Sequence, residues 1–228
     1  MGPSLRRWWS RRRMLGHPGE EALARYAREC VPIAGKTPWR NARFVVFDTE
    51  ATGLDLVADR LLSIAGVATR GDVVVLADSF EVILAGEEVG AQAAPVHGLV
   101  PKDLAEGLEE AQAVDAFLAY AGAAVLVAHH AAFDVAMLDR SLGARGGRLL
   151  NPVLDTEHLA RRLAGGSSPG VLARQPRQSL DALAERFGLA TEARHTAAGD
   201  ALLTALVLQR LLQDAERRGI RTVGELVR

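Results

Sequence analysis

The amino-acid sequence predicts an α/β fold in which a mixed β-sheet is flanked by α-helices. Three observations support this prediction. Three strand-like runs follow one another in the first half, and helical and strand patterns alternate in the second half. The chain has 228 residues of which 49% are apolar, enough to bury the core of one ordinary domain with some sequence to spare. The expected order of elements is βββαβαβαα.

The first strands are expected over residues 43–50, 61–70 and 73–84, where Val, Ile, Leu and Phe are concentrated. A turn around Gly71 separates the second run from the third. Three consecutive strands with short connections indicate a meander.

The second half alternates between the two patterns. Apolar residues at helical spacing predict a helix over residues 108–120, and a continuous apolar run predicts a buried strand over 124–130. A helix over 133–142 is expected to end at Gly143, and a brief fifth strand should cover 152–156.

Two helices are expected to complete this part of the chain. The shorter spans residues 179–188, with Ser179 as its N-terminal cap and Gly188 at its end. The longer runs from about residue 197 to 217.

Charge divides the chain unevenly. Residues 1–43 carry ten Lys or Arg and three acids, whereas the remainder carries 17 bases and 25 acids. We therefore expect a basic N-terminal extension and linker over 1–42, a main domain over 43–215 and a short C-terminal segment over 216–228. The sequence GGSSPG, residues 165–170, is typical of a mobile surface loop.

Composition excludes several classes of protein. The longest nearly unbroken apolar stretch is too short to cross a bilayer, and no hydrophobic segment follows the basic start RRWWSRRR. We therefore expect a cytoplasmic protein with no membrane partner. Cys30 is the only cysteine, which excludes an internal disulfide and a cysteine-built metal cluster. A metal would need oxygen or imidazole ligands, which favours hard cations.

Two acids mark the end of the first strand. Asp48 and Glu50 are two residues apart, so their side chains should project from the same face. Two carboxylates in one small space repel each other unless a cation or a donor lies between them. A divalent metal would resolve the repulsion. Alternatively, both acids face solvent in a turn in which Thr49 and Thr52 bond the backbone around Gly53.

Two later segments repeat this pattern. His129 and His130 end the predicted strand over 124–130, and Asp134 lies at the start of the next helix. Strand ends of an α/β sheet meet at one crevice, which would bring Asp134 to the first pair. His195 and Asp200 flank the start of the last helix. The alternatives are helix acids stabilised by the macrodipole or by solvent, and a loop histidine.

Together these segments resemble the DEDD superfamily of 3′-to-5′ exonucleases, in the histidine-bearing (DEDDh, DnaQ-like) branch. That branch includes proofreading subunits such as epsilon of bacterial DNA polymerase III, ribonuclease T and oligoribonuclease. The resemblance covers about residues 43–212 and implies a ribonuclease H-like fold. The three motifs are carried by Asp48, Glu50, Ala51, Thr52 and Gly53; by His129, His130, Ala131, Phe133 and Asp134; and by His195, Ala197 and Asp200.

Two shorter stretches add to this resemblance. VHGLV, residues 96–100, is similar to the His-Gly-Ile stretch of the family, and DTEHLAR, residues 155–161, is similar to its Asp-Thr segment. The chain also departs from the pattern. His130 stands in place of the usual asparagine, and Thr196 and Gly199 differ from the commoner residues of the third motif. Gly199 is expected to loosen the start of its helix by less than ~1 kcal/mol relative to Ala.

The resemblance implies a role for each matching residue. Asp48 is expected to bridge two divalent cations, Mg²⁺ or Mn²⁺, with Glu50 and Asp200 completing the first site and Asp134 holding the second. His195 is expected to act as general base. The residues expected to hold the terminal nucleotide are Thr52, Gly53, Leu54, His97, His129 and Phe133.

By the same resemblance, nucleoside 5′-monophosphates should be released from single-stranded or frayed 3′ ends. We favour DNA over RNA, and proofreading or repair with a polymerase or another replication or repair partner. An exoribonuclease of the ribonuclease T or oligoribonuclease type is the main alternative. A non-catalytic nucleic-acid binding module and a two-metal hydrolase of small molecules are further alternatives.

The first 13 residues form a basic arm. Its arginines flank Trp8 and Trp9, so the arm could neutralise phosphates and stack on bases as a tether for the substrate strand. A disordered tail or a docking peptide for a protein partner is the alternative. The arginines concerned are Arg6, Arg7, Arg11, Arg12 and Arg13.

Overall fold

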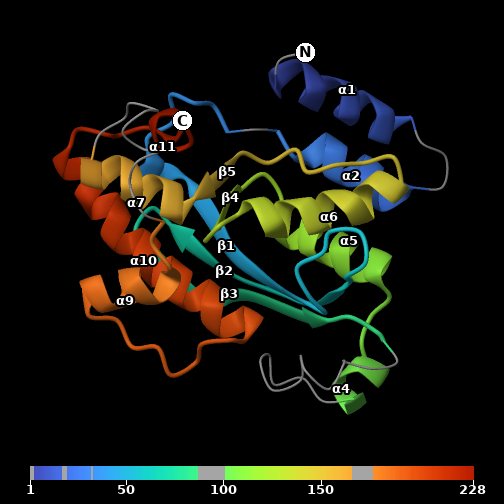
Figure 1. Cartoon of the computed structure of the whole chain (residues 1–228). Helices are drawn as coiled ribbons and strands as arrows, with labels where there is room; N and C mark the ends of the chain where they lie inside the picture. Colours follow the sequence, from blue (N-terminus) through green and yellow to red (C-terminus); the bar gives the residue numbers. More distant parts are fainter. Residues whose placement is uncertain (1–2, 17–19, 32, 87–100, 166–176) are drawn as a thin grey trace.

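A computed structural model of the chain shows one mixed β-sheet with helices packed on both of its faces (Figure 1). The structure describes residues 3–16, 20–31, 33–86, 101–165 and 177–228. Within these residues the predicted α/β fold with a mixed sheet flanked by helices is confirmed.

The strands of the sheet are β1 Arg43–Ala51, β2 Leu61–Arg70, β3 Val73–Ile83, β4 Val125–Ala128 and β5 Val153–Asp155. Their order across the sheet is β3-β2-β1-β4-β5. β1 is central: it pairs antiparallel with β2 and parallel with β4, which in turn pairs parallel with β5. The carboxyl ends of β1, β4 and β5 therefore meet at one edge of the sheet.

The helices agree with the sequence prediction in the main domain, with exceptions given below. The predicted short helix is α9, whose N-cap Ser179 accepts a hydrogen bond from the N–H of Ala182, and Gly188 ends it in the left-handed conformation. The helices are α1 Pro3–Leu15, α2 Glu21–Glu29, η1 Trp39–Asn41, α4 Pro101–Ala105, α5 Glu110–Ala121, α6 Ala132–Ala144, α7 Thr156–Gly165, α9 Leu180–Phe187, α10 Ala197–Arg217 and α11 Val223–Leu226.

Two hydrophobic cores cover the two faces of the sheet, because successive side chains of a strand point to opposite faces. Val45 and Phe47 of β1 enter the first core, which α2, α5 and α6 cover. Phe44 and Val46 enter the second core, which α7, α9, α10 and α11 cover. Burying each such side chain contributes about 1.5–3 kcal/mol, so β1 is anchored from both sides.

One predicted helix end was wrong. α6 continues through Gly143 to Ala144 instead of ending before the glycine. A Cβ atom at Gly143 would meet nothing within 4 Å, and the φ angle of this residue is not positive, so the helix tolerates it. The chain reverses later, at Gly146, where φ is 79°.

Within the residues that the structure describes, helices α1, α4, α7 and α11 and the 3-10 helix η1 were not predicted. Of these, α7 packs on the second core, in which Leu159, Ala160 and Leu163 bury one of its faces. Of the predicted surface loop over 165–170, Gly165 ends α7 and the remainder lies outside the described residues.

Residues preceding β1 pack into the cores of the domain. Leu23 and Tyr26 of α2 are buried in the first core. The hydroxyl of Tyr26 donates to the side-chain oxygen of Asn151 at 2.5 Å and accepts from the N–H of Leu150 at 2.8 Å. Arg145 lies nearby and forms ion pairs with Glu20 and Asp115.

The segments on either side of the proposed main domain also meet each other. Trp39 is buried in the second core, and its indole N–H donates to the carbonyl of Ile220 at 3.0 Å. Val223 and Leu226 of α11 are buried in the same core. Both flanking segments therefore pack on the cores of the domain. The predicted domain boundaries at residues 42 and 215 stay a prediction. Among the described residues, no helix combines the length and apolar character needed to cross a bilayer.

Candidate active site

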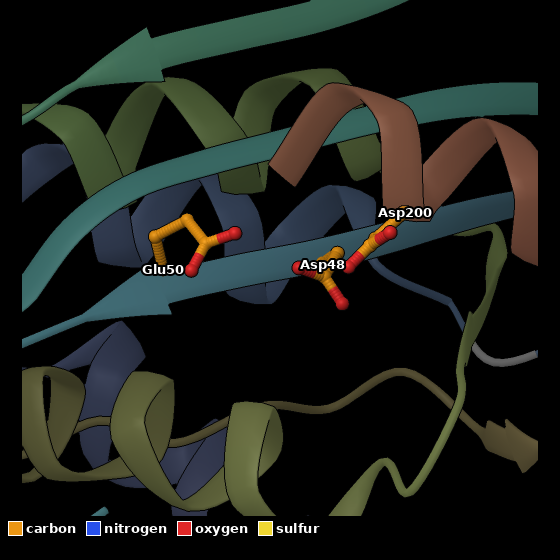
Figure 2. A group of neighbouring side chains, drawn as sticks. All are labelled: Asp48, Glu50 and Asp200. Carbon is orange, nitrogen blue, oxygen red and sulfur yellow. The ribbon is translucent and has the colours of Figure 1, made fainter. Parts of the chain in front are cut away.

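Three carboxylates meet at the carboxyl end of β1. Asp48 and Glu50 project from the same face of the strand, as predicted, and Asp200 reaches them from the first turn of α10 (Figure 2). One ligand atom from each of the three side chains lies within 4.8 Å of the others. The structure thus brings together three of the four acids predicted as metal ligands.

The pKa values of Asp48 and Glu50 are raised in this site. Burial raises the pKa of Asp48 well above its usual range, and the negative charges of Asp134, Asp200 and Glu50 raise it further. Burial, followed by the charges of Asp200 and Asp134, raises the pKa of Glu50 to about 7. Repulsion of this kind is relieved when a cation enters the cluster.

The fourth acid, Asp134, approaches from the opposite face of the sheet. It lies in the first turn of α6 and is 5% exposed. One of its carboxylate oxygens accepts hydrogen bonds from the N–H of Thr49 at 3.1 Å and from its hydroxyl at 2.7 Å. Thr49 points to the α6 side because its neighbours Asp48 and Glu50 point to the α10 side. For this reason Asp134 is not part of the group within 4.8 Å.

Strand pairing explains why the backbone N–H of Thr49 can bond a side chain. The paired stretch of β1 and β4 ends at Val46 and Val127, so β1 extends beyond its parallel neighbour. The carboxylate of Asp134 takes the place of the missing strand. Burial raises the pKa of Asp134 to about 7, although the hydrogen bonds from Thr49 act in the opposite direction.

His195 immediately precedes α10 and its cap residue. Its φ angle is 67°, in the left-handed region, where His is more common than most residues. Its side chain is exposed to solvent, and its N–H donates to a carboxylate oxygen of Asp200 at 3.4 Å. The histidine predicted as general base therefore lies beside the acidic cluster with its imidazole accessible.

The effect expected of Gly199 was wrong. The glycine does not simply loosen α10, because an ideal Cβ there would lie 1.7 Å from the carbonyl oxygen of Ala193. Thr196 caps the helix by accepting from the N–H of Gly199 at 3.0 Å and donates to the same Ala193 carbonyl at 3.2 Å. Only glycine allows the segment that carries His195 to approach α10 so closely.

Arg194 is a charged residue of the site that sequence reasoning missed. Its guanidinium forms an ion pair with Asp200 and another with Asp181 of α9. It precedes the histidine of the third motif, but the chain contains many arginines and nothing in the residue type singled this one out. It brings a positive charge to the acidic cluster and lowers the pKa of Asp48 and Glu50 against the larger effect of burial.

His129 binds protein groups with both ring nitrogens. Nδ1 lies 2.9 Å from the hydroxyl of Thr156, and Nε2 lies 3.0 Å from the carbonyl oxygen of Gln178. The carbonyl can only accept, so Nε2 carries the proton and Nδ1 accepts from the hydroxyl. Burial, followed by the charge of His130, lowers the pKa of His129 to about 4. In this conformation the ring joins β4, α7 and the segment before α9, and a substrate would have to displace one of these bonds.

His130 adopts the left-handed conformation with a φ of 59°. Its N–H and that of Ala131 donate to the two carboxylate oxygens of Asp155 at 3.2 and 3.0 Å. Asn and His both tolerate this backbone region better than most residues. Histidine in place of the usual asparagine therefore keeps the turn between β4 and α6.

Four of the remaining predicted substrate contacts are described by the structure. The hydroxyl of Thr52 donates to Asp59 at 2.7 Å, and a Cβ at Gly53 would lie 2.5 Å from the carboxylate of that same Asp59. Leu54 is 85% exposed, whereas Phe133 is half-buried against the first core. His97, together with the stretch 96–100, lies outside the described residues.

Curated relatives match most of this chain. It is 36% identical over 218 residues to a DNA polymerase III subunit epsilon-like protein of Rhodobacter capsulatus, covering 94% of this chain and 28% of the relative. It is 32% identical over 195 residues to a PolC-type DNA polymerase III of Halalkalibacterium halodurans, covering 83% and 13% respectively. The chain thus spans less than a third of the length of either relative.

Solved structures share the fold. Exonuclease I of E. coli in complex with a dT13 oligonucleotide matches with a TM-score of 0.63 and 14% identity, covering 78% of this chain and 42% of that one. Cell-death related nuclease 4 matches with a TM-score of 0.59 and 13% identity, covering 75% and 64%. These likenesses confirm the ribonuclease H-like architecture expected from the motifs.

A model of a protein family matches most of the chain. The model named RNase_T and described as "Exonuclease" matches residues 45–208, the span that contains the three acids of the cluster, Asp134 and His195. The resemblance read from the three motifs is thereby confirmed, and the chain belongs to this exonuclease family.

Proposed function

We propose that the protein is a metal-dependent 3′-to-5′ exonuclease that removes nucleoside 5′-monophosphates from the 3′ end of DNA, in proofreading or repair. The observation that carries the proposal is the meeting of Asp48, Glu50 and Asp200 within 4.8 Å, with Asp134 and His195 beside them. Five residues from three separate segments of the sequence converge on one end of β1, as the resemblance to the histidine-bearing exonucleases implies.

The acidic cluster fits divalent cations. Its donors are carboxylate oxygens, the ligands that Mg²⁺ and Mn²⁺ prefer, and the pKa values of Asp48 and Glu50 are raised first by burial and then by the charges of the neighbouring acids. We assign one cation to Asp48, Glu50 and Asp200. A second cation would be held by Asp48 and Asp134, and the hydrogen bonds from Thr49 to one oxygen of Asp134 hold that carboxylate in place.

Two cations in such a site would stabilise the charge of the attacking water and of the departing 3′ oxygen. The protein's own groups supply the remaining functions. His195, accessible to solvent beside Asp200, accepts the proton of the attacking water. Thr49 orients Asp134, and the close packing of Gly199 on Ala193 fixes the segment that carries His195.

The terminal nucleotide would be held mainly by shape and apolar contact. Leu54 is almost fully exposed beside the end of β1 and can pack on a base without reading its identity. Phe133 and the backbone around Gly53 would complete this contact. His129 would contribute by holding the end of β4 in place through its bonds to Thr156 and Gln178.

DNA is the favoured substrate because the relatives include polymerase III proteins and a neighbour in fold was solved with a dT13 oligonucleotide. The same relatives support a polymerase or another replication or repair protein as partner, and a cytoplasmic location. The exoribonuclease alternative predicts instead that RNA is cleaved in preference to DNA.

The decisive experiment compares single-stranded DNA, mismatched duplex DNA and RNA, each labelled at the 5′ end and, separately, at the 3′ end. With Mg²⁺ or Mn²⁺ we expect stepwise shortening of 5′-labelled DNA and immediate release of labelled mononucleotide from 3′-labelled DNA. Asp48→Asn is the control, because it removes a central carboxylate while keeping the side-chain shape.

Each contrary outcome identifies an alternative. Preferential shortening of RNA would establish the exoribonuclease, and mononucleotides released from the 5′ end would reverse the proposed direction. Binding without cleavage would identify a non-catalytic module. Hydrolysis of free nucleotides without cleavage of strands would identify a hydrolase of small molecules.

A further inference from the structure

Arg194 connects the acidic cluster to α9 through two different edges of its guanidinium. Nη1 contacts a carboxylate oxygen of Asp200. Nε and Nη2 face the two carboxylate oxygens of Asp181 at 2.7 and 3.3 Å. The Arg194 side chain is 16% exposed and that of Asp200 13%, whereas Asp181 is 60% exposed. One edge of the Arg194 guanidinium therefore faces the acidic cluster, and the other edge is held by the carboxylate of Asp181, which lies outside the cluster.

This arrangement has a direct physical reason. Three carboxylates within 4.8 Å of one another destabilise the folded chain, and a positive group against one of them reduces that repulsion. Arginine suits the position because its guanidinium is planar, always charged, and able to bond two carboxylates at once. However, the carboxylate of Asp200 that contacts Arg194 is also one of the three carboxylates that can hold a metal ion.

We propose that Arg194 is a positioning residue that competes with the metal for Asp200 and is retained by Asp181 when the metal enters. The inference rests on the proposed function, because it concerns the same cation site. On metal binding, Nη1 leaves Asp200 while the Nε and Nη2 edge keeps Asp181, so a single contact is exchanged for a metal bond. Arg194 thus stabilises the metal-free protein and limits the affinity for the cation.

Competition predicts opposite effects for two substitutions. Arg194→Gln removes the competing charge, so Mn²⁺ should bind more tightly by roughly fivefold or more, the lower end of ordinary coupling between two sites. The same substitution should lower the melting temperature in EDTA. Asp181→Asn removes the group that retains the displaced guanidinium, so Arg194 should hold Asp200 more firmly and Mn²⁺ should bind more weakly.

A matched control lies on the same two helices. Arg186 of α9 pairs with Asp214 of α10 at 3.6 Å. Arg186→Gln therefore removes an arginine and an ion pair between α9 and α10 outside the acidic cluster. It should lower the melting temperature equally in EDTA and in saturating Mn²⁺ and leave the Mn²⁺ dissociation constant unchanged.

The experiment measures the Mn²⁺ dissociation constant of the full chain by electron paramagnetic resonance of free Mn²⁺, and melting temperatures with and without the ion. Arg194→Lys serves as a second variant should Arg194→Gln fold poorly, because it keeps the charge but lacks the second edge. Its affinity should fall between those of the wild type and Arg194→Gln. The inference would be overturned if Arg194→Gln bound Mn²⁺ with unchanged or weaker affinity and if its melting temperature fell equally with and without the ion.

The outcomes separate this inference from the proposed function. If the wild-type protein digests 3′ ends but Arg194→Gln binds Mn²⁺ with unchanged affinity, the competition is wrong and the exonuclease assignment stands. If Mn²⁺ binding responds as expected but no strand is cleaved, the exonuclease assignment fails alone. A wild-type chain that binds no Mn²⁺ would overturn both.

Discussion

Thr49 donates both its backbone N–H and its hydroxyl to a single carboxylate oxygen of Asp134. The residue between the two acids of the first motif thus holds the acid of the second motif from the opposite face of β1. A side chain that binds neither metal nor substrate in our proposal fixes the direction in which Asp134 points.

The first prediction removes one of these two bonds. Thr49→Val keeps the volume and the N–H but loses the hydroxyl, so the buried carboxylate of Asp134 loses one of its donors. We expect the free energy of unfolding at pH 8 to fall by about 1.5–3 kcal/mol, the range for a hydrogen bond to a charged group. Urea denaturation measures the loss. Thr49→Ser should restore most of it, and equal stability of the Val and Ser variants would show that the hydroxyl has no such role.

The second prediction concerns His195, whose imidazole is accessible beside Asp200. His195→Ala should lower turnover by roughly 10²- to 10⁴-fold, the usual contribution of a general base, with substrate affinity largely kept. Single-turnover digestion and a separate binding assay measure the two quantities. A parallel loss of affinity and turnover would instead make His195 a substrate contact.

The third prediction links metal, pH and stability. In the metal-free folded chain the pKa values of Glu50 and Asp134 are raised to about 7, whereas unfolded carboxyls titrate near ~4. Between these values the folded chain binds more protons than the unfolded chain. The stability of the metal-free protein should therefore fall as the pH rises from about 4 to about 7.

Cation binding should reverse this loss. Saturating Mn²⁺ should raise the melting temperature more at pH 8 than at pH 5, because protonated carboxyls bind the ion poorly. Asp48→Asn is the control: it removes one of the repelling charges, so we expect it to be more stable than the wild type without metal at pH 8 and less responsive to Mn²⁺. A Mn²⁺ effect that is equal at both pH values would contradict the acidic cluster as the binding site.

The fourth prediction tests the close approach at Gly199. Gly199→Ala places a methyl group against the carbonyl of Ala193, which belongs to the backbone and cannot move without displacing His195. We expect a lower melting temperature and at least a roughly tenfold loss of turnover, because small displacements of catalytic groups are costly. Gly143→Ala is the matched control, since its Cβ meets nothing within 4 Å and should stabilise α6 by up to ~1 kcal/mol. If both variants behave alike, Gly199 is an ordinary helix glycine.

The fifth prediction concerns the basic arm, which the structure describes as helix α1 with Trp9 54% exposed and Met14 buried in the first core. Four substitutions, Arg6→Ser, Arg7→Ser, Arg12→Ser and Arg13→Ser, keep the anchoring Met14. If the arm is a tether, binding of single strands should weaken at low salt and its salt slope should flatten by at most ~2.8 units, since each phosphate contact contributes about 0.7. Unchanged affinity and slope would favour a protein partner for the arm.

The sequence predicted the parts of the fold whose pattern is local. Strands β1, β2 and β3 are long and apolar, and the alternation of Asp48, Thr49 and Glu50 correctly placed the two acids on one face. Helix α7 was missed because its first residues, Thr156 and Glu157, are polar yet buried. Their polarity interrupts the spacing of apolar residues by which a helix is recognised.

The rest of the site depends on contacts between distant residues. The ion pair of Arg194 with Asp181, the bond of Thr49 to Asp134 and the bond of His129 to Gln178 each join segments that no local pattern relates. Burial of Tyr26 against Asn151 was likewise hidden, although Leu23, Tyr26 and Ala27 have the spacing of one helix face. The motifs named the residues that we propose to react, but not the residues that hold them in place.

The position of α10 has a consequence for how this protein is made. β1 leaves the ribosome before α10, but its Phe44 and Val46 face the second core, to which α10 contributes more residues than any other helix, and Asp200 of α10 completes the acidic cluster. Until the chain has been synthesised to about residue 217, one face of the sheet lacks its cover and the cluster lacks its third carboxylate. A growing chain therefore exposes an apolar surface that chaperones can recognise, and it lacks the complete acidic cluster until its synthesis has reached α10.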